Sequence, residues 1–277
     1  MKKFFSPFLT LTFLFVFSLN SVGQTYRILI SNDDGIESPL LESLYNEIQA
    51  LPNVEVIIAA PRLNQSGASH STDSRATTVE KLYKNSSFFG YAVGGRPSDA
   101  VRYGIKVLGK EKPFDLVVSG INQGANVGNI AHMSGTVGAA MEALYYGIPS
   151  IAVSQERYGV NTELSAKFVS QLIIKYQKEG APKGVVISVN IPSGEPKGVA
   201  IRPMGDYYLK REFQKTEELD NKMKYEEKYS IRKSTDTESD TYAYQNGYIT
   251  ITPLKFDWTE YKLLDRLESW DLKVIKN

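Results

Sequence analysis

Two adjacent aspartates, Asp33 and Asp34, follow an apolar run that ends at Ile30. On a tight turn, neighbouring carboxylates repel each other unless a cation or hydrogen-bond donors neutralise them. Hard divalent cations take carboxylate oxygens as ligands, so the pair favours a metal site. An Asp-Asp-Gly sequence, completed here by Gly35, is also typical of an ordinary turn, and the pair alone leaves both interpretations open.

Neutral oxygen donors follow two other apolar runs of the chain. Ser66 comes shortly after a run that ends at Ala59, and Asn122 comes after another that ends at Ser119. The carboxyl ends of parallel strands meet at one edge of a sheet, so we expect both residues near the aspartates. Oxygen-only donors are typical of Mg²⁺ or Mn²⁺, whereas zinc normally recruits histidine, of which the chain has only two. The expected ligands of one divalent cation are Asp33, Asp34, Ser66 and Asn122.

A short segment of small and hydroxyl residues, Ser134, Gly135 and Thr136, opens an Ala-rich run with helical spacing. Backbone N–H groups at such a helix start bind phosphate oxygens, so the segment predicts a phosphate site. The same residues would cap the helix in any case, and the two roles are compatible because capping leaves other N–H groups available. Further small or polar residues expected at this sheet edge are Asn32, Gly67 and Asn126.

The composition excludes several classes of site. The 277 residues are 42% hydrophobic and 23% charged, which is ordinary for a globular protein. Lys plus Arg number 32 and Asp plus Glu 31, so we expect no nucleic-acid polymer as a partner. The lack of cysteine excludes disulfides, thiolate metal sites and cysteine nucleophiles. Ser66 and Ser134 are conceivable nucleophiles, but neither lies in a Gly-x-Ser-x-Gly elbow, so we favour an activated water.

The N-terminus has the pattern of a secretory signal peptide. Lys2 and Lys3 precede an apolar stretch that ends at Leu19, and small and polar residues follow. The stretch is shorter than the roughly 20 residues that span a bilayer. We therefore expect residues 1–23 to be a signal peptide, with export to the periplasm or the exterior and no stable membrane anchor. An uncleaved anchor is the alternative.

Strand-like and helix-like segments alternate through most of the chain. Nearly continuous β-branched runs predict strands that are buried on both faces of a parallel sheet. The alternation predicts one doubly wound α/β domain over residues 24–277, with its core at about 26–200. The predicted strands cover 28–30, 54–59, 116–119, 151–154 and 185–189, and the predicted helices cover about 40–51 and 164–176.

The segment from about 205 onward is different in character. It is rich in charged and aromatic residues and has no sustained apolar face, which indicates either a solvated hairpin or an arm that packs on another subunit. Residues 248–252 then alternate like a strand. Leu263, Leu264, Leu267 and Trp270 predict a closing helix.

Seven blocks of the sequence, taken in order from Ile28 to about Leu254, resemble the SurE (survival protein) nucleotidase family. The resemblance implies a Rossmann-like core and a C-terminal arm used for dimerisation, hence a homodimer or homotetramer. It also implies a metal-dependent phosphomonoesterase that acts on nucleoside 5′- and 3′-monophosphates. The blocks are ILISNDDGI, APRLNQSGASHS, GGRPSDAV, DLVVSGINQGANVGN, SGTVGAAMEA, GIPSIAVS and GYITITPL.

The resemblance assigns roles residue by residue. The family's metal ligands align with Asp33, Asp34, Ser66 and Asn122. Its phosphate and active-site segment aligns with Asn126, Ser134, Gly135 and Thr136. We expect the catalytic residues to be Asp33, Asp34, Asn126 and Ser134, and the phosphate-binding residues to be Asn32, Gly67, Gly135 and Thr136.

The chain departs from the family pattern at two positions. Arg96 stands where Thr is usual, and Met133 stands where Tyr or His is expected. His132 is a candidate to protonate the leaving group, as is a water molecule on the metal. Two other functions stay open at this point: a hydrolase of short polyphosphate, and an exported protein that binds nucleotide or phosphate without turnover.

Overall fold

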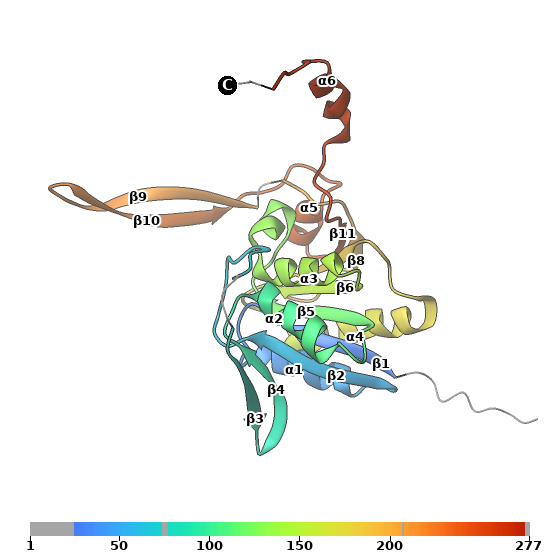
Figure 1. The fold of residues 1–277 in the computed structure, drawn as a ribbon. Helices are drawn as coiled ribbons and strands as arrows, with labels where there is room; N and C mark the ends of the chain where they lie inside the picture. The colour runs from blue at the N-terminus through green and yellow to red at the C-terminus, as the bar shows by residue number, and fades with distance from the viewer. Residues whose placement is uncertain (1–24, 74–76, 207, 275–277) are drawn as a thin grey trace, which may run out of the picture.

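The computed structural model of the chain describes residues 25–73, 77–206 and 208–274, so the expected signal peptide at 1–23 lies outside the described residues. A nine-stranded sheet with the order β3-β4-β2-β1-β5-β6-β7-β11-β8 runs through the centre (Figure 1). Helices cover both of its faces, as the doubly wound prediction requires. Among the described helices, none combines the length and the apolar composition needed to cross a bilayer.

The five predicted buried runs form the parallel centre of the sheet, which confirms the predicted fold class. Most of their hydrophobic residues are buried, because helices pack on both faces, whereas Tyr26 and the first four residues of β2 are half-buried. The bounds of all five strands differ from the prediction by one to four residues. The largest difference is in the third run, which continues past Ser119, through an irregularity in its pairing, so Asn122 lies within the strand. The strands are β1 (Tyr26–Ser31), β2 (Val54–Pro61), β5 (Leu116–Gln123), β6 (Ser150–Gln155) and β7 (Val186–Ile191).

Four further strands form the two edges of the sheet. A hairpin of β3 (Val79–Lys84) and β4 (Ser87–Val93) extends the sheet beyond β2. On the other side, β11 (Ile249–Leu254) runs antiparallel to β7 and carries β8 (Val199–Ile201). The alternation at 248–252 correctly predicts β11. The β3–β4 hairpin is not predicted, because the charged and polar residues of β3 leave no continuous apolar run.

Two pairs of helices enclose the sheet. The helices α1 (Pro39–Gln49) and α4 (Thr162–Glu179) pack together on one face, and α2 (Pro97–Tyr103) and α3 (Gly135–Tyr145) pack on the other. Local signals define α4 and α3, since Asn161 and Ser134 cap their first turns through their side chains. The shorter helices are η1 (Gly104–Leu108), η2 (Gly128–Met133), α5 (Asp240–Gln245), η3 (Tyr261–Leu263) and α6 (Leu264–Glu268).

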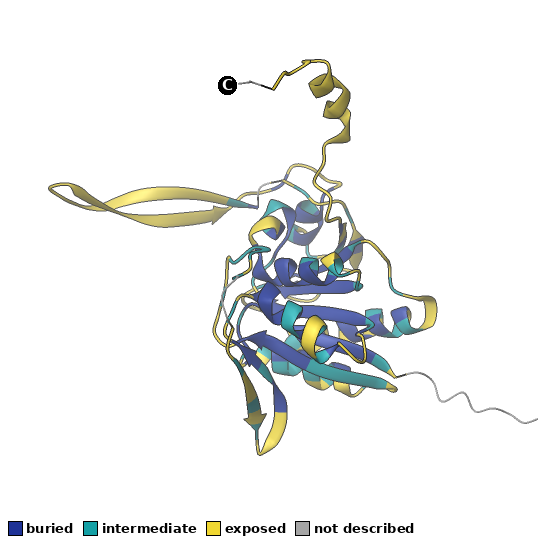
Figure 2. Ribbon diagram, viewed as in Figure 1, coloured by how far each residue is buried: buried dark blue, intermediate teal, exposed yellow. Residues whose placement is uncertain are grey.

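The charged and aromatic segment forms a long hairpin, β9 (Leu209–Leu219) with β10 (Lys222–Ile231), which confirms the predicted C-terminal hairpin. It projects away from the sheet, and all its residues except the half-buried Leu209 are exposed (Figures 1 and 2). The predicted closing helix is shorter than expected. The five residues of α6 are exposed and stand clear of the core, because so short a helix buries little apolar surface.

Candidate active site

The turn after β1 is shaped by Asn32. Its side-chain amide donates to the Gly35 carbonyl at 2.8 Å and accepts from the Gly35 N–H at 3.2 Å. Gly35 has φ +100°, and a Cβ there would lie 3.2 Å from the backbone carbon of Leu63, so the position requires glycine. Asn32 is buried and bonded within the turn that carries Asp33 and Asp34. Its expected contact with phosphate stays a prediction.

Asp33 lies directly against the start of α3. The Thr136 hydroxyl donates to one of its carboxylate oxygens at 2.5 Å. A Cβ added to Gly135 would lie only 2.8 Å from the Asp33 Cβ, so α3 approaches this closely only because residue 135 has no side chain. The structure therefore brings one expected metal ligand together with two expected phosphate-binding residues.

Asp34 is held by the loop that carries Ser66 and by the end of β5, which carries Asn122. The Asn64 amide donates to one carboxylate oxygen at 3.2 Å, and the Gln123 N–H donates to the other at 3.2 Å. Asn64 also accepts from the Ser66 N–H at 2.9 Å, and Gln123 directly follows Asn122. The backbone around Ser66 and Asn122 is thereby tied to Asp34. The sequence places Asn64 and Gln123 after the second and third predicted strands, but it does not identify either as a partner of Asp34.

A row of polar residues crosses the carboxyl ends of three strands. Asn122 on β5 pairs with Ser154 on β6, which pairs with Asn190 on β7. The buried Asn126 is fixed to this row, since its N–H donates to Asn190 at 2.7 Å and its side-chain amide donates to Ser154 at 2.8 Å. Both anchors are polar residues at the ends of predicted strands, which is the signal that could have identified them.

The loop after β2 lies across the first turn of α3. The Ser69 N–H donates to the Met133 carbonyl at 3.2 Å. A Cβ on Gly138 would meet the Ser69 carbonyl oxygen at 2.1 Å, so loop and helix are in direct contact. Ser66 and Gly67 are exposed on this loop.

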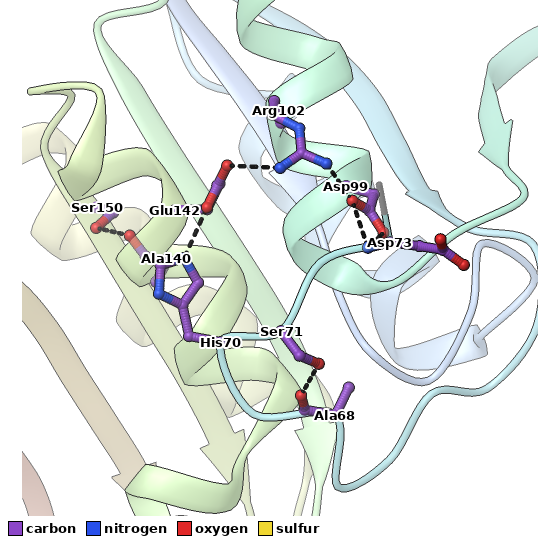
Figure 3. A network of polar contacts seen from close by, with 9 residues as sticks. All are labelled: Ala68, His70, Ser71, Asp73, Asp99, Arg102, Ala140, Glu142 and Ser150. Carbon is purple, nitrogen blue, oxygen red and sulfur yellow. Dashed lines mark hydrogen bonds and ion pairs between the residues drawn. The ribbon is translucent and has the colours of Figure 1, made fainter. Parts of the chain in front are cut away.

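A polar network that sequence reasoning missed holds the same loop (Figure 3). The His70 ring lies 2.6 Å from the Glu142 carboxylate on α3. Arg102 on α2 lies 3.7 Å from Glu142 and also forms an ion pair with Asp99. Asp99 in turn accepts from the Asp73 N–H at 3.0 Å. The loop is therefore fixed to both helices on this face of the sheet.

Arg96, which stands where the family usually has Thr, forms hydrogen bonds within the protein. Its N–H donates to the Asp99 carboxylate at 2.9 Å, at the start of α2. Its exposed guanidinium donates to the Ser71 hydroxyl. Arg96 thus supports the loop after β2.

The two aspartates form an anionic site that favours a cation. Burial, and to a smaller extent the charge of Asp34, raise the pKa of Asp33 from 3.8 to about 6, against the lowering effect of Thr136. Burial also raises the pKa of Asp34, although the Gln123 N–H and the charge of Arg157 lower it. The hydrogen-bond donors described above for both carboxylates are neutral.

The donor set fits a hard divalent cation. Nowhere in the described residues does a group of three or more His, Cys, Asp or Glu side chains gather in a way that could hold a metal. A cation at this site would therefore rely on two carboxylates and on neutral oxygens. Such oxygen ligands are those of a hard divalent cation.

Known proteins share this fold and sequence. Residues 28–211 match the family described as "Survival protein SurE". A "5′-nucleotidase SurE" from Thermoanaerobacter sp. (strain X514) is 38% identical over 253 residues, which cover 90% of this chain and 99% of that protein. Another from Syntrophobacter fumaroxidans (strain DSM 10017 / MPOB) is 35% identical, with 89% and 100% covered. The crystal structure of the SurE protein from Aquifex aeolicus superimposes with a TM-score of 0.77 at 33% identity, over 89% of this chain and 100% of that one. The chain therefore belongs to the survival protein SurE family.

Proposed function

We propose that the chain is a metal-dependent nucleotidase that hydrolyses nucleoside 5′- and 3′-monophosphates to nucleoside and phosphate. The observation that carries this proposal is the contact between Asp33 and the start of α3, made by Thr136 and Gly135. It joins an anionic, cation-binding turn to a helix N-terminus that attracts phosphate. The relatives named 5′-nucleotidase SurE support the same activity.

The proposed metal site has two carboxylates and two neutral oxygens. The ligands would be Asp33, Asp34, Ser66 and Asn122. A divalent cation bound there, Mg²⁺ or Mn²⁺, would polarise the phosphoryl oxygens and lower the pKa of a water nucleophile. Asn64 and Gln123 hold the Asp34 carboxylate in place, so the site is largely formed before a ligand arrives.

The phosphate would lie at the start of α3. Ser134 caps the helix by accepting from the Val137 N–H at 3.1 Å, a role that is compatible with donating its own proton to a phosphate oxygen. The positive end of the helix dipole would stabilise negative charge as it develops on phosphorus. We assign Gly67, Gly135 and Thr136 to phosphate binding. Asn126, anchored on β6 and β7, would orient the water or the phosphate.

A substrate panel tests the activity. Phosphate release would be measured from 5′- and 3′-nucleoside monophosphates and from short polyphosphate, with Mg²⁺, Mn²⁺ or EDTA present. We expect release from the nucleotides that EDTA abolishes. Release from polyphosphate alone would replace the proposal with a polyphosphate hydrolase. Calorimetric binding of nucleotide without release, in the presence of metal, would instead indicate a binding protein.

We also propose that the β9–β10 hairpin joins copies of the chain into a homodimer or homotetramer. Phe213 on β9 is paired with Glu227 on β10, so the two side chains lie on the same face of the hairpin. Tyr225 and Tyr229 are two residues before and after Glu227 on β10, so their rings share that face with Phe213. Their exposed fractions are 72%, 50% and 64% respectively, so the hairpin carries a stripe of exposed aromatic surface.

Light scattering after size-exclusion chromatography tests this assembly. Replacement of Phe213 and Tyr229 with Ser should lower the molar mass to that of a monomer. The matched control is Glu226→Ser, which changes an exposed residue of the opposite hairpin face. A monomeric wild-type protein would contradict the proposal.

We propose further that residues 1–23 direct export. The mature protein should then be found in the periplasm or the medium and should begin near Gln24. Mass spectrometry of the exported protein identifies its first residue directly. The proposal would be overturned if the protein stayed inside the cell with residues 1–23 still attached.

A further inference from the structure

A cavity of about 680 Å³ lies beside the proposed phosphate site. Its lining includes Ser134, Val137 and Met141 from α3 and its cap, and Phe256 and Trp258 from the segment after β11. Ser134 belongs to both sites, whereas neither Asp33 nor Asp34 lines the cavity. The cavity therefore adjoins the proposed phosphate site at Ser134 and is not lined by the aspartates.

The size and lining of the cavity suit the organic part of a phosphate ester. Its volume lies within the range of about 300–1,000 Å³ that is usual for small-molecule sites. Most of the lining is apolar, including Val137, Met141 and Leu254, and Phe256 and Trp258 add large aromatic rings. A bare phosphate or a polyphosphate has no group that would gain from such surfaces. A flat aromatic base does.

Trp258 is placed to offer a ring face to such a base. Its side chain is 76% exposed, although tryptophan normally buries most of its surface. Its ring is 5.3 Å from that of His132 at an interplanar angle of 86°, an edge contact that orients the indole without stacking on it. Phe256 has a similar edge contact with His70, at 5.7 Å and 83°.

We propose that Trp258 is the base-stacking residue of a nucleoside subsite in this cavity, with Phe256 as its neighbour and Val137 and Met141 as its apolar floor. The inference rests on the proposed nucleotidase function, since it places the phosphate at Ser134. Phe256 and Trp258 lie outside the range 28–211 that matches the family description, so this wall is built by the C-terminal part of the chain.

The subsite makes a prediction about substrate discrimination. Stacking of a base on an aromatic side chain is worth roughly tenfold or more in affinity. In Trp258→Ala, KM for AMP should rise about tenfold, whereas KM for glycerol 2-phosphate, which has no base, should not change. Trp258→Phe should restore most of the loss. The matched control is Trp270→Ala, an exposed tryptophan of the same tail that does not line the cavity.

A binding measurement separates this inference from the activity itself. The chain has two tryptophans, so in Trp270→Phe the fluorescence reports on Trp258 alone. Adenosine, added to this variant in EDTA, should quench that fluorescence in a saturable way. Absence of saturable quenching, or equal effects of Trp258→Ala on AMP and glycerol 2-phosphate, would overturn the subsite. If the wild type released phosphate from no ester while adenosine still quenched, the nucleotidase proposal alone would fail.

Discussion

The hydroxyl of Thr136 donates a hydrogen bond of 2.5 Å to the carboxylate of Asp33, although the two residues are 103 positions apart in the chain. Both are buried, so this bond links the turn after β1 to the first turn of α3 inside the protein. It fixes the orientation of a carboxylate whose pKa is raised to about 6. The distance between the proposed metal site and the proposed phosphate site depends on this contact.

Replacement of Thr136 by Val tests how its hydroxyl affects the pKa of Asp33 and the stability of the protein. Loss of the donor raises the pKa of Asp33 further, so the acidic limb of the pH profile of kcat should move to higher pH. The free energy of unfolding should fall by about 1–2 kcal/mol, because a buried acceptor loses its donor. Thr250→Val is the matched control, since Thr250 is equally buried but its hydroxyl has no hydrogen-bond partner among the described residues. An unchanged pH profile would contradict this role of Thr136.

The raised pKa of Asp33 predicts how the metal-free protein responds to pH. The folded state holds this proton up to about pH 6, whereas the unfolded chain releases it near pH 4. Between these values the unfolded state binds fewer protons, so the free energy of unfolding falls as pH rises, by up to about 3 kcal/mol. Asp33→Asn removes the titration and should be the more stable protein at pH 7 in EDTA.

Urea unfolding in EDTA from pH 4 to 7.5 measures this difference. The gap between Asp33→Asn and wild type should be small near pH 4 and should widen towards pH 7. Addition of Mg²⁺ at pH 7 should then raise Tm for the wild type and have little effect on the variant. Parallel pH dependences of the two proteins would show that Asp33 ionises in its ordinary range.

Asn64→Ala tests the support of Asp34. The substitution removes an amide that bonds both the Asp34 carboxylate and the Ser66 backbone. Partners of this kind orient metal ligands, and their loss typically weakens metal affinity by tenfold or more. The Mg²⁺ concentration for half-maximal activity should rise roughly tenfold while kcat at saturation changes little. Asn246→Ala, at the exposed end of α5, should leave the Mg²⁺ dependence as it is.

The sequence correctly predicts the strands and the helix start that position the site, for physical reasons. Continuous apolar runs such as 28–30 and 116–119 identify strands that are buried on both faces. Parallel strands then bring Asp33 and Asn122 to the same edge of the sheet. Ser134 is recognised as a helix cap because capping depends on residues within a single turn.

The contacts that support the site could not be predicted in the same way. Asn64 and Gln123 hold Asp34 across long sequence separations, and neither lies in a local pattern that distinguishes it from other exposed polar residues. The contacts of Glu142 with His70 and Arg102 depend on how α2, α3 and the loop after β2 pack. Such contacts follow from tertiary packing, which hydrophobic periodicity does not encode.

The sequence also does not predict where the C-terminal helix lies. The apolar residues at 263–270 correctly predict a helix, but the periodicity does not say which surface receives it. In the structure α6 stands away from the core, and Leu264 and Leu267 are exposed.

The most direct test of the central claim is phosphate release from AMP by wild type, Asp34→Asn and Asp220→Asn, each with Mg²⁺, Mn²⁺ or EDTA. Asp220 is exposed in the β9–β10 turn and serves as the matched control for the loss of one carboxylate. We predict metal-dependent release by wild type and Asp220→Asn, and a loss of at least 100-fold in Asp34→Asn with the fold intact, an order of magnitude typical for removal of a key electrostatic group. Full activity of Asp34→Asn, or full activity of the wild type in EDTA, would contradict a metal-dependent nucleotidase built on the aspartate pair.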